Sequence, residues 1–88
     1  MNVPQVVKIK DIIEETPTVK TLIFDWEVTD EVPGQFMMLW NFHDEKPMSL
    51  SLIDPVKGEI GFTIRKVGKF TQALHDMEVG NQIGLRGP

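Results

Sequence analysis

The segment MSLSLIDPVKGEIGFTIRKV, at positions 48–67, decides the fold of this chain. In its second half Ile60, Phe62 and Ile64 occupy every other position, which is the two-residue period of a β-strand. In its first half Leu50 and Leu52 alternate with serines in the same way. The residues at 54–58, Asp-Pro-Val-Lys-Gly, are of the types that form turns. The segment therefore predicts a β-hairpin with strands at 48–53 and 59–67.

Short apolar segments separated by turn residues continue this pattern on both sides of the hairpin. They predict further strands over residues 3–13, 19–28, 35–42 and 82–86. One segment differs, because Phe70, Ala73, Leu74 and Met77 recur at helical spacing and predict a helix of about two turns. We expect an all-β fold, a six-stranded antiparallel Greek-key barrel with one short helix between the last two strands. Closure would hide the strand edges of this one domain, residues 1–88.

Composition excludes several classes of protein. The chain has 88 residues and a net charge of −4, which argues against nucleic-acid binding. It has no cysteine, so disulfides, zinc sites built on Cys, thiolate-bound iron–sulfur centres and thiol nucleophiles are all absent from it. The longest apolar run, at 36–40, is too short to span a membrane, and the N-terminus lacks the pattern of a secretion signal. We expect a cytoplasmic domain.

No conventional catalytic set is present. His43, Asp44 and Glu45 are adjacent on a predicted loop and are expected to form a solvated surface cluster. The sequence therefore predicts neither catalytic residues nor metal ligands.

Two segments carry residue types suited to a phosphate-bearing ligand. The first, KPMSLS at 46–51, places a cation, a proline, a thioether and a hydroxyl in succession at the start of a strand. The second, IRKVGKFT at 64–71, runs from a strand through a glycine into a helix, beside three cations in an acidic chain. Each feature also has a purely structural reading: Gly68 as a strand end, Thr71 as a helix cap and Met48 as core.

Four motifs carry a resemblance to a known family: PGQF at 33–36, KPMSLS at 46–51, IRKVGKFT at 64–71 and GLRGP at 84–88. In this order the chain resembles the FAD-binding barrel domain of the ferredoxin-reductase-like superfamily. Within that superfamily it is most similar to the electron-transfer subunits of NAD-linked dihydroorotate dehydrogenases, enzymes of pyrimidine biosynthesis.

The resemblance implies roles for the first segment. Lys46 would face the phosphates of FAD, and Pro47 and Met48 would pack near the isoalloxazine ring. Ser49 would form a hydrogen bond near flavin N5, where a hydroxyl can serve as donor or acceptor.

It also implies roles for the second segment. Residues that would line the cofactor are Thr63, Ile64 and Arg65. Residues that would bring helix-start donors to the pyrophosphate are Gly68, Phe70 and Thr71.

The sequence departs from the family pattern at three points. Lys46 replaces the usual arginine and so lacks its bidentate fork. The chain has no tyrosine, and Met48 stands where many relatives place an aromatic residue. Phe70 stands where many relatives have glycine, and is expected either to stack on a base or to be core.

The resemblance further implies a cofactor and a partner. The cofactor would be FAD, and the partner would be a catalytic dehydrogenase subunit. NAD binding and a [2Fe–2S] cluster are expected only in a C-terminal part that this chain lacks, so the chain would not be a complete catalyst.

Two alternatives stay open. One is the flavin domain of another ferredoxin-NADP reductase-like, sulfide dehydrogenase or hydrogenase subunit. The other is a non-enzymatic β-barrel for protein interaction, with Met37, Met38 and Trp40 in a docking surface.

Overall fold

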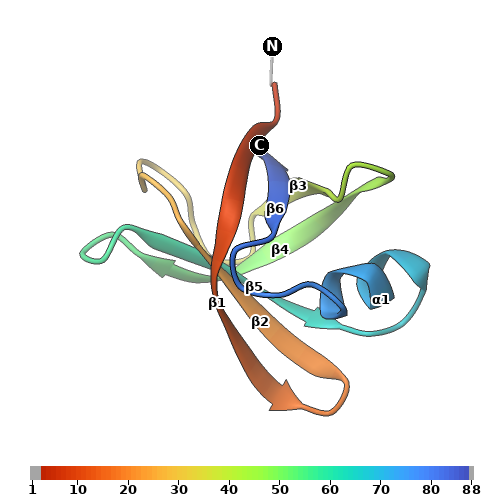
Figure 1. Ribbon diagram of the computed structural model, residues 1–88. Coiled ribbons are helices and arrows are strands. Elements are labelled where there is room, and N and C mark those ends of the chain that lie inside the picture. The colour runs from red at the N-terminus through yellow and green to blue at the C-terminus, as the bar shows by residue number, and fades with distance from the viewer. Residues whose placement is uncertain (1–2, 88) are drawn as a thin grey trace.

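The computed structural model describes residues 3–87 and forms a closed barrel of six antiparallel strands with one short helix (Figure 1). The elements in chain order are β1 (Gln5–Thr16), β2 (Val19–Asp25), β3 (Phe36–Trp40), β4 (Glu45–Asp54), β5 (Glu59–Arg65), α1 (Lys69–His75) and β6 (Gln82–Arg86). The order around the barrel is β1-β2-β5-β4-β3-β6. Because β6 lies beside β3, the last four strands form a Greek key. The predicted fold class is confirmed.

Two long strands close the barrel by pairing with different neighbours along their length. The first part of β1 pairs with β6 through Gln5–Lys8, and the rest pairs with β2 from Ile9 onward. In β4, Glu45–Ser49 pair with β3, whereas Leu50–Asp54 pair with β5. Both strands contain register shifts, and such bulges bend a strand sharply. This bending lets two small sheets share β1 and β4 and leave no open edge.

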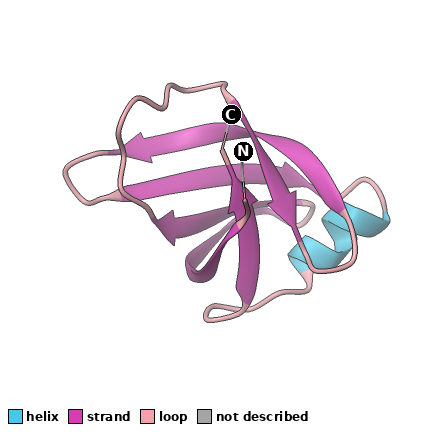
Figure 2. Cartoon of the chain, turned by 90° about the horizontal axis from the view of Figure 1, so that it is seen from above, coloured by secondary structure: helices cyan, strands magenta, loops and turns pink. Residues whose placement is uncertain are grey.

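The barrel interior holds one apolar core. Phe24 and Phe62 are fully buried and meet edge to face, with ring centroids 6.0 Å apart. Phe70 and Leu74 of α1 belong to the same core, so the helix closes one end of the barrel. Seen from above, α1 lies at one side of the strands (Figure 2).

The structure corrects the predicted element boundaries. β1 extends to Thr16 and β4 begins at Glu45, whereas β2, β3 and β5 end two or more residues earlier than predicted. β6 has the predicted bounds, and α1 lies one to two residues N-terminal of the predicted helix.

The structure shows which face of β3 is inside, which the sequence leaves open because both faces carry apolar residues. Met37 and Leu39 are buried, while Phe36 is 60% exposed and Met38 and Trp40 are half-buried. Phe42 lies outside the strand, at a positive φ of 73°. Because Met37 is core, the predicted docking surface of Met37, Met38 and Trp40 cannot include it. The predicted alternation of β4 also breaks, because the register shift after Leu50 leaves both Leu52 and Ile53 half-buried.

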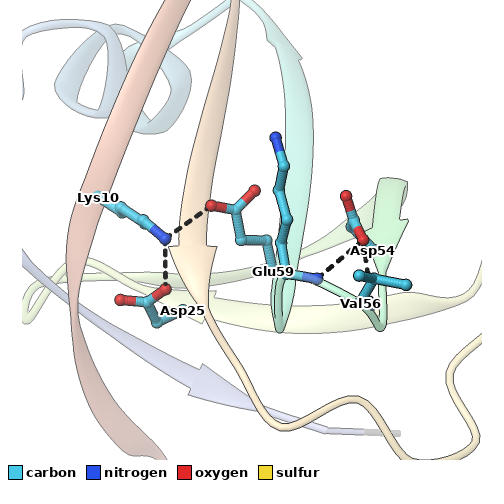
Figure 3. Close-up of polar contacts among 6 residues, drawn as sticks. Lys10, Asp25, Asp54, Val56 and Glu59 are labelled. Carbon is cyan, nitrogen blue, oxygen red and sulfur yellow. Dashed lines mark hydrogen bonds and ion pairs between the residues drawn. The ribbon is translucent and has the colours of Figure 1, made fainter.

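Ion pairs join strands on the outside of the barrel. Lys10 Nζ lies 2.9 Å from Asp25 Oδ1 and 2.7 Å from Glu59 Oε2, so one cation links β1, β2 and β5 (Figure 3). Hydrogen bonds to Glu59 and Asp25 raise the pKa of Lys10 above its ordinary value. In the neighbouring β4–β5 turn, Asp54 Oδ1 accepts hydrogen bonds from the N–H groups of Val56 and Lys57 (Figure 3).

A second ion pair spans β3. Arg86 donates from Nε and Nη2 to the two oxygens of Glu45, at 3.0 and 2.7 Å. The pair therefore ties β6 to β4 across the strand between them. The hydrogen bond from Arg86 lowers the pKa of Glu45 below its ordinary value.

We expect Gly84→Ala to destabilise the barrel. A Cβ at Gly84 would lie 2.7 Å from Cε3 of Trp40, so the indole must move. Overpacking of this kind costs about 1–3 kcal/mol, which urea unfolding would measure. Gly87→Ala is the matched control, because a Cβ there meets nothing within 4 Å. Equal unfolding midpoints for the two variants would contradict the packing of Trp40 on Gly84.

The Glu45–Arg86 pair predicts a pH dependence of stability. Because the folded pKa of Glu45 is lowered from 4.5, its contribution is present at neutral pH and is lost as pH falls through the folded pKa. Arg86→Met should therefore destabilise the protein at pH 7, and its deficit relative to wild type should shrink below about pH 4.5. Urea unfolding at a series of pH values measures this, with Lys57→Met as the control for charge loss. A deficit that stays constant with pH would show that Arg86 acts through packing alone.

Candidate functional site

The first predicted site segment lies where β4 leaves β5. The ladder between these strands ends at Leu50 and Phe62, so residues 46–49 pair only with β3. Lys46 and Pro47 are thus inside β4 and not in the loop before it. Met48 is half-buried, and Ser49 is exposed. The last residues of β5, Thr63–Arg65, lie beyond the point where the two strands diverge.

A pocket of about 330 Å³ brings the two predicted segments together. It is lined by Asp44 just before β4, by Lys46 within β4, and by the residues from Val67 to Thr71 at the start of α1. The lining therefore contains four of the predicted site residues: Lys46, Gly68, Phe70 and Thr71. The other six, Pro47, Met48, Ser49, Thr63, Ile64 and Arg65, do not line this pocket.

The start of α1 is organised by Thr71. Its Oγ1 accepts hydrogen bonds from the N–H groups of Val67 and Gly68, at 2.8 and 3.0 Å, and donates to the Gly68 carbonyl. Gly68 has no side chain with which to cap the helix. The N–H groups of the first helical turn have no acceptor within the helix, so those of Lys69 and Phe70 are available at the pocket wall.

Hydrogen bonds of a buried histidine hold the C-terminal end of α1 against the barrel. His75 is 6% exposed, and its Nε2 lies 2.7 Å from the Ile64 carbonyl oxygen of β5. Lys20 of β2 donates to the His75 carbonyl at 2.9 Å. These two bonds fix the helix to β2 and β5 and thereby fix its first turn relative to Lys46. The sequence analysis assigned no role to His75, although it follows Thr71 at the (i, i+4) spacing of one helix face.

Two predicted site residues have core side chains. Ile64 is 1% exposed and Phe70 is 5% exposed, and both belong to the barrel core. Phe70 is thus part of the barrel core, and it also lines the pocket.

Thr63 belongs to a chain of hydroxyl groups on the outside of the barrel. Its Oγ1 lies 2.9 Å from Thr21 Oγ1 and 2.8 Å from Ser51 Oγ. Thr21 in turn donates to Glu15 Oε2 at 2.8 Å. A carboxylate only accepts, so Thr21 donates to Glu15 and Thr63 donates to Thr21. The direction of the Thr63 hydroxyl is therefore set by neighbouring strands.

Three residues of the pocket lining are outside the predicted site: Asp44, Val67 and Lys69. The sequence predicts Asp44 to be only a solvated loop residue, and it gives Lys69 a place near the site as a cation but no role of its own. For Lys69 the signal was its position directly after Gly68, but for Asp44 no sequence pattern pointed there.

A second pocket, of about 350 Å³, adjoins the first through Asp44. It is lined by Pro4, Trp40, His43, Asp44, Glu45 and Arg86. Trp40 and Phe42 have ring centroids 4.5 Å apart at its edge. Within residues 3–87, no three His, Asp or Glu side chains converge as metal ligands, and no helix has the length and apolarity that a membrane crossing needs.

Comparison with known proteins identifies relatives of the whole chain. No family model matches it. A probable dihydroorotate dehydrogenase B (NAD(+)), electron transfer subunit, from Methanothermobacter thermautotrophicus is 58% identical over 89 aligned positions, which span all of this chain. The protein of the same name from Methanocaldococcus jannaschii is 44% identical over the whole chain. The chain is homologous to these electron transfer subunits. It spans about a third of their length, 34% and 32% respectively.

A solved structure shares the fold. The cytochrome b5 reductase domain of Ulva prolifera nitrate reductase superimposes with a TM-score of 0.75 over 98% of this chain and 40% of that one. The identity is only 17%, so this likeness concerns the barrel and its helix and not the site residues. Homology to the electron transfer subunits thus comes from sequence, and the barrel architecture is supported independently.

Proposed function

We propose that this chain is an FAD-binding electron-transfer domain of an NAD-linked dihydroorotate dehydrogenase, acting in the cytoplasm in pyrimidine biosynthesis. Its partner would be a catalytic dehydrogenase subunit. The observation that carries the proposal is the convergence of Lys46 with the first turn of α1 around one pocket, in a chain 58% identical to such a subunit. The similarity to the electron transfer subunits favours this function over that of another reductase subunit.

The pocket fits a pyrophosphate. Lys46 and Lys69 both line it, and within residues 3–87 neither ammonium group is bonded to a carboxylate. The N–H groups at the start of α1 add neutral donors on the same wall. Thr71 would hold that turn in place, because its hydroxyl is already committed to Val67 and Gly68. Two cations without ion-pair partners and the backbone N–H groups of the first helical turn suit a group with two anionic phosphates.

The side chains where β4 diverges from β5 would suit contact with the flavin ring. Met48 offers a polarisable thioether that packs well against an aromatic ring. Ser49 is exposed beside it and has no hydrogen-bond partner within residues 3–87, so its hydroxyl is free to donate or accept. Bound flavin would supply the electron-carrying chemistry. The protein's own part is to hold the ring, orient it through Ser49 and keep Thr63 fixed by its neighbours.

The iron–sulfur and NAD-binding parts of the proposed enzyme lie outside these 88 residues. The chain has no cysteine, so a thiolate-bound iron–sulfur cluster must be held elsewhere. NAD binding is likewise assigned to a part outside these residues, since they contain no glycine-rich βαβ unit. Electrons would enter and leave the flavin through those parts and through the catalytic subunit.

FAD should bind this chain through its phosphates. We expect saturable quenching of flavin fluorescence on titration with FAD and none with riboflavin. Lys46→Ala should weaken FAD binding by about tenfold to a hundredfold, which corresponds to the loss of one charge-assisted hydrogen bond. Lys57→Ala removes an equal charge on the β4–β5 turn and should leave the affinity unchanged. Equal binding of FAD and riboflavin would contradict the assignment of the pocket to the phosphates of FAD.

Ser49 should tune the flavin. Ser49→Ala removes the free hydroxyl, and we expect the midpoint potential of bound FAD to move by about 10–30 mV, corresponding to roughly 0.5–1.5 kcal/mol for a two-electron couple. Thr29→Ala is the control, because it removes a hydroxyl that bonds only to Asp30 and Glu31 in the loop after β2. Spectroelectrochemical titration measures both variants. If the midpoint potential of FAD bound to Ser49→Ala equals that of wild type, Ser49 does not face the flavin.

A further inference from the structure

A chain of three hydroxyl groups on the outside of the barrel ends at a carboxylate. Ser51 Oγ lies 2.8 Å from Thr63 Oγ1, which lies 2.9 Å from Thr21 Oγ1. Thr21 in turn donates to Glu15 Oε2 at 2.8 Å. The four side chains come from β4, β5, β2 and β1, which are successive neighbours around the barrel. The chain thus crosses four adjacent strands, and none of its residues lines the pocket at the start of α1.

Both ends of this chain are extra residues at β-bulges. The ladder between β1 and β2 skips Glu15, and the ladder between β4 and β5 skips Ser51. A bulge re-aims the side chain of its extra residue and is over-represented beside functional sites. Thr21 and Thr63, by contrast, are a directly opposed pair of β2 and β5. The two bulges therefore bring both ends of the chain onto the face where the Thr21–Thr63 pair lies.

The carboxylate fixes the direction of every hydrogen bond in the chain. Each hydroxyl has one hydrogen, and an ionised carboxylate only accepts. Thr21 gives its hydrogen to Glu15, so Thr63 must give its own to Thr21. Ser51 must then donate to Thr63, or to the Gly61 carbonyl 3.3 Å away. In either case the Ser51 hydrogen is committed within the protein, and Ser51 Oγ can only accept from a ligand.

Burial of the middle of the chain preserves this direction. Thr21 is 3% exposed, so little water competes for its hydroxyl. Ser51 and Thr63 are exposed, on either side of the point where β4 and β5 diverge. Hydrogen bonds that all point the same way polarise one another, and this makes the last oxygen a stronger acceptor. The exposed end of the chain is therefore an acceptor of fixed direction.

An acceptor of fixed direction distinguishes the oxidation states of a flavin. Two ring nitrogens of a flavin change from hydrogen-bond acceptors into N–H donors when the ring takes up two electrons and two protons. Ser51 Oγ can accept from such an N–H, but it has no hydrogen to offer to the same nitrogen of the oxidised ring. Ser49, whose hydroxyl has no partner within residues 3–87, can serve both states. The two serines of β4 therefore differ in what they can do for the ring.

We propose that the chain from Glu15 to Ser51 tunes the bound flavin by stabilising its reduced form. Ser51 accepts the hydrogen bond from the ring, and Glu15 is a positioning residue that acts through Thr21 and Thr63. The inference rests on the proposed function, because the flavin is the proposed cofactor. It adds Ser51, Thr21 and Glu15 to the residues that serve the site.

The test measures the midpoint potential of bound FAD by spectroelectrochemical titration. Ser51→Ala removes the acceptor, so we expect the ratio of reduced to oxidised FAD at a fixed potential to fall about threefold. For a two-electron couple this is a midpoint about 14 mV lower. Glu15→Gln should also lower the midpoint, because a carboxamide can donate as well as accept and no longer fixes the direction of the chain. In the Ser51→Ala background, Glu15→Gln should cause no further fall.

Glu14→Gln is the matched control. It removes the same charge one position away from Glu15, outside the hydroxyl chain. Loss of a nearby negative charge by itself favours the electron-rich form of the flavin and raises the midpoint. A purely Coulombic effect would thus shift both glutamate variants upward, whereas the chain predicts that only Glu15→Gln falls below wild type.

Two results would overturn the inference while the proposed function stands. If FAD binds and Ser51→Ala leaves the midpoint unchanged or raises it, Ser51 accepts no hydrogen bond from the reduced ring. If Glu15→Gln and Glu14→Gln shift the midpoint alike, Glu15 acts through its charge and not through the hydroxyls.

A wild-type chain that binds no FAD would contradict the proposed function and, with it, the tuning of a flavin. Urea unfolding of the ligand-free chain then decides whether the hydroxyls are coupled to the carboxylate. Thr63→Val should destabilise wild type more than it destabilises Glu15→Gln, because the polarised chain is already lost in the latter. Equal losses in the two backgrounds would show that the hydroxyls act independently and would overturn the chain itself.

Discussion

The bend in β4 is the constraint on which the rest of the molecule depends. One strand must complete the ladder of β3 with its first half and that of β5 with its second half, or the barrel stays open. The register shift after Leu50 makes this change of partner possible. Because of the same change, Lys46 in β4 and the last residues of β5 are not paired with each other. Closure of the barrel thus creates the opening into which α1 packs and beside which the pocket forms.

The short helix is held by the barrel more than by its own sequence. A helix of seven residues is too short to be stable alone. Phe70 and Leu74 anchor it in the core, and His75 and Lys20 tie its last turn to β5 and β2. Because both ends are fixed, the first turn has a defined position opposite Lys46. A pocket wall made of backbone donors needs this rigidity, since such donors recognise a ligand only if they do not move.

Sequence periodicity predicted the fold where one face of an element is polar. The hairpin at 48–67 and the helix near 70 show a clear period, and both were found close to their predicted places. Periodicity failed on β3, because an apolar residue on each face gives no sign of which one points inward. It failed again at Leu52 and Ile53, where a bulge reverses the alternation without a distinctive residue. Asp44 could not be predicted at all, since its place in the pocket depends on a turn held by Asn41 and on a helix distant in sequence.

The distribution of cations separates those that stabilise the fold from those that serve the pocket. Lys10 and Arg86 each bind carboxylates across strands, and Lys20 binds a helix carbonyl. Within residues 3–87 the other cations have no such partner, although the chain has a net charge of −4, and of these only Lys46 and Lys69 line the pocket. Two unpaired ammonium groups beside one pocket contribute little to stability and repel each other weakly. Their arrangement is therefore better explained by an anionic ligand that binds between them than by any need of the barrel.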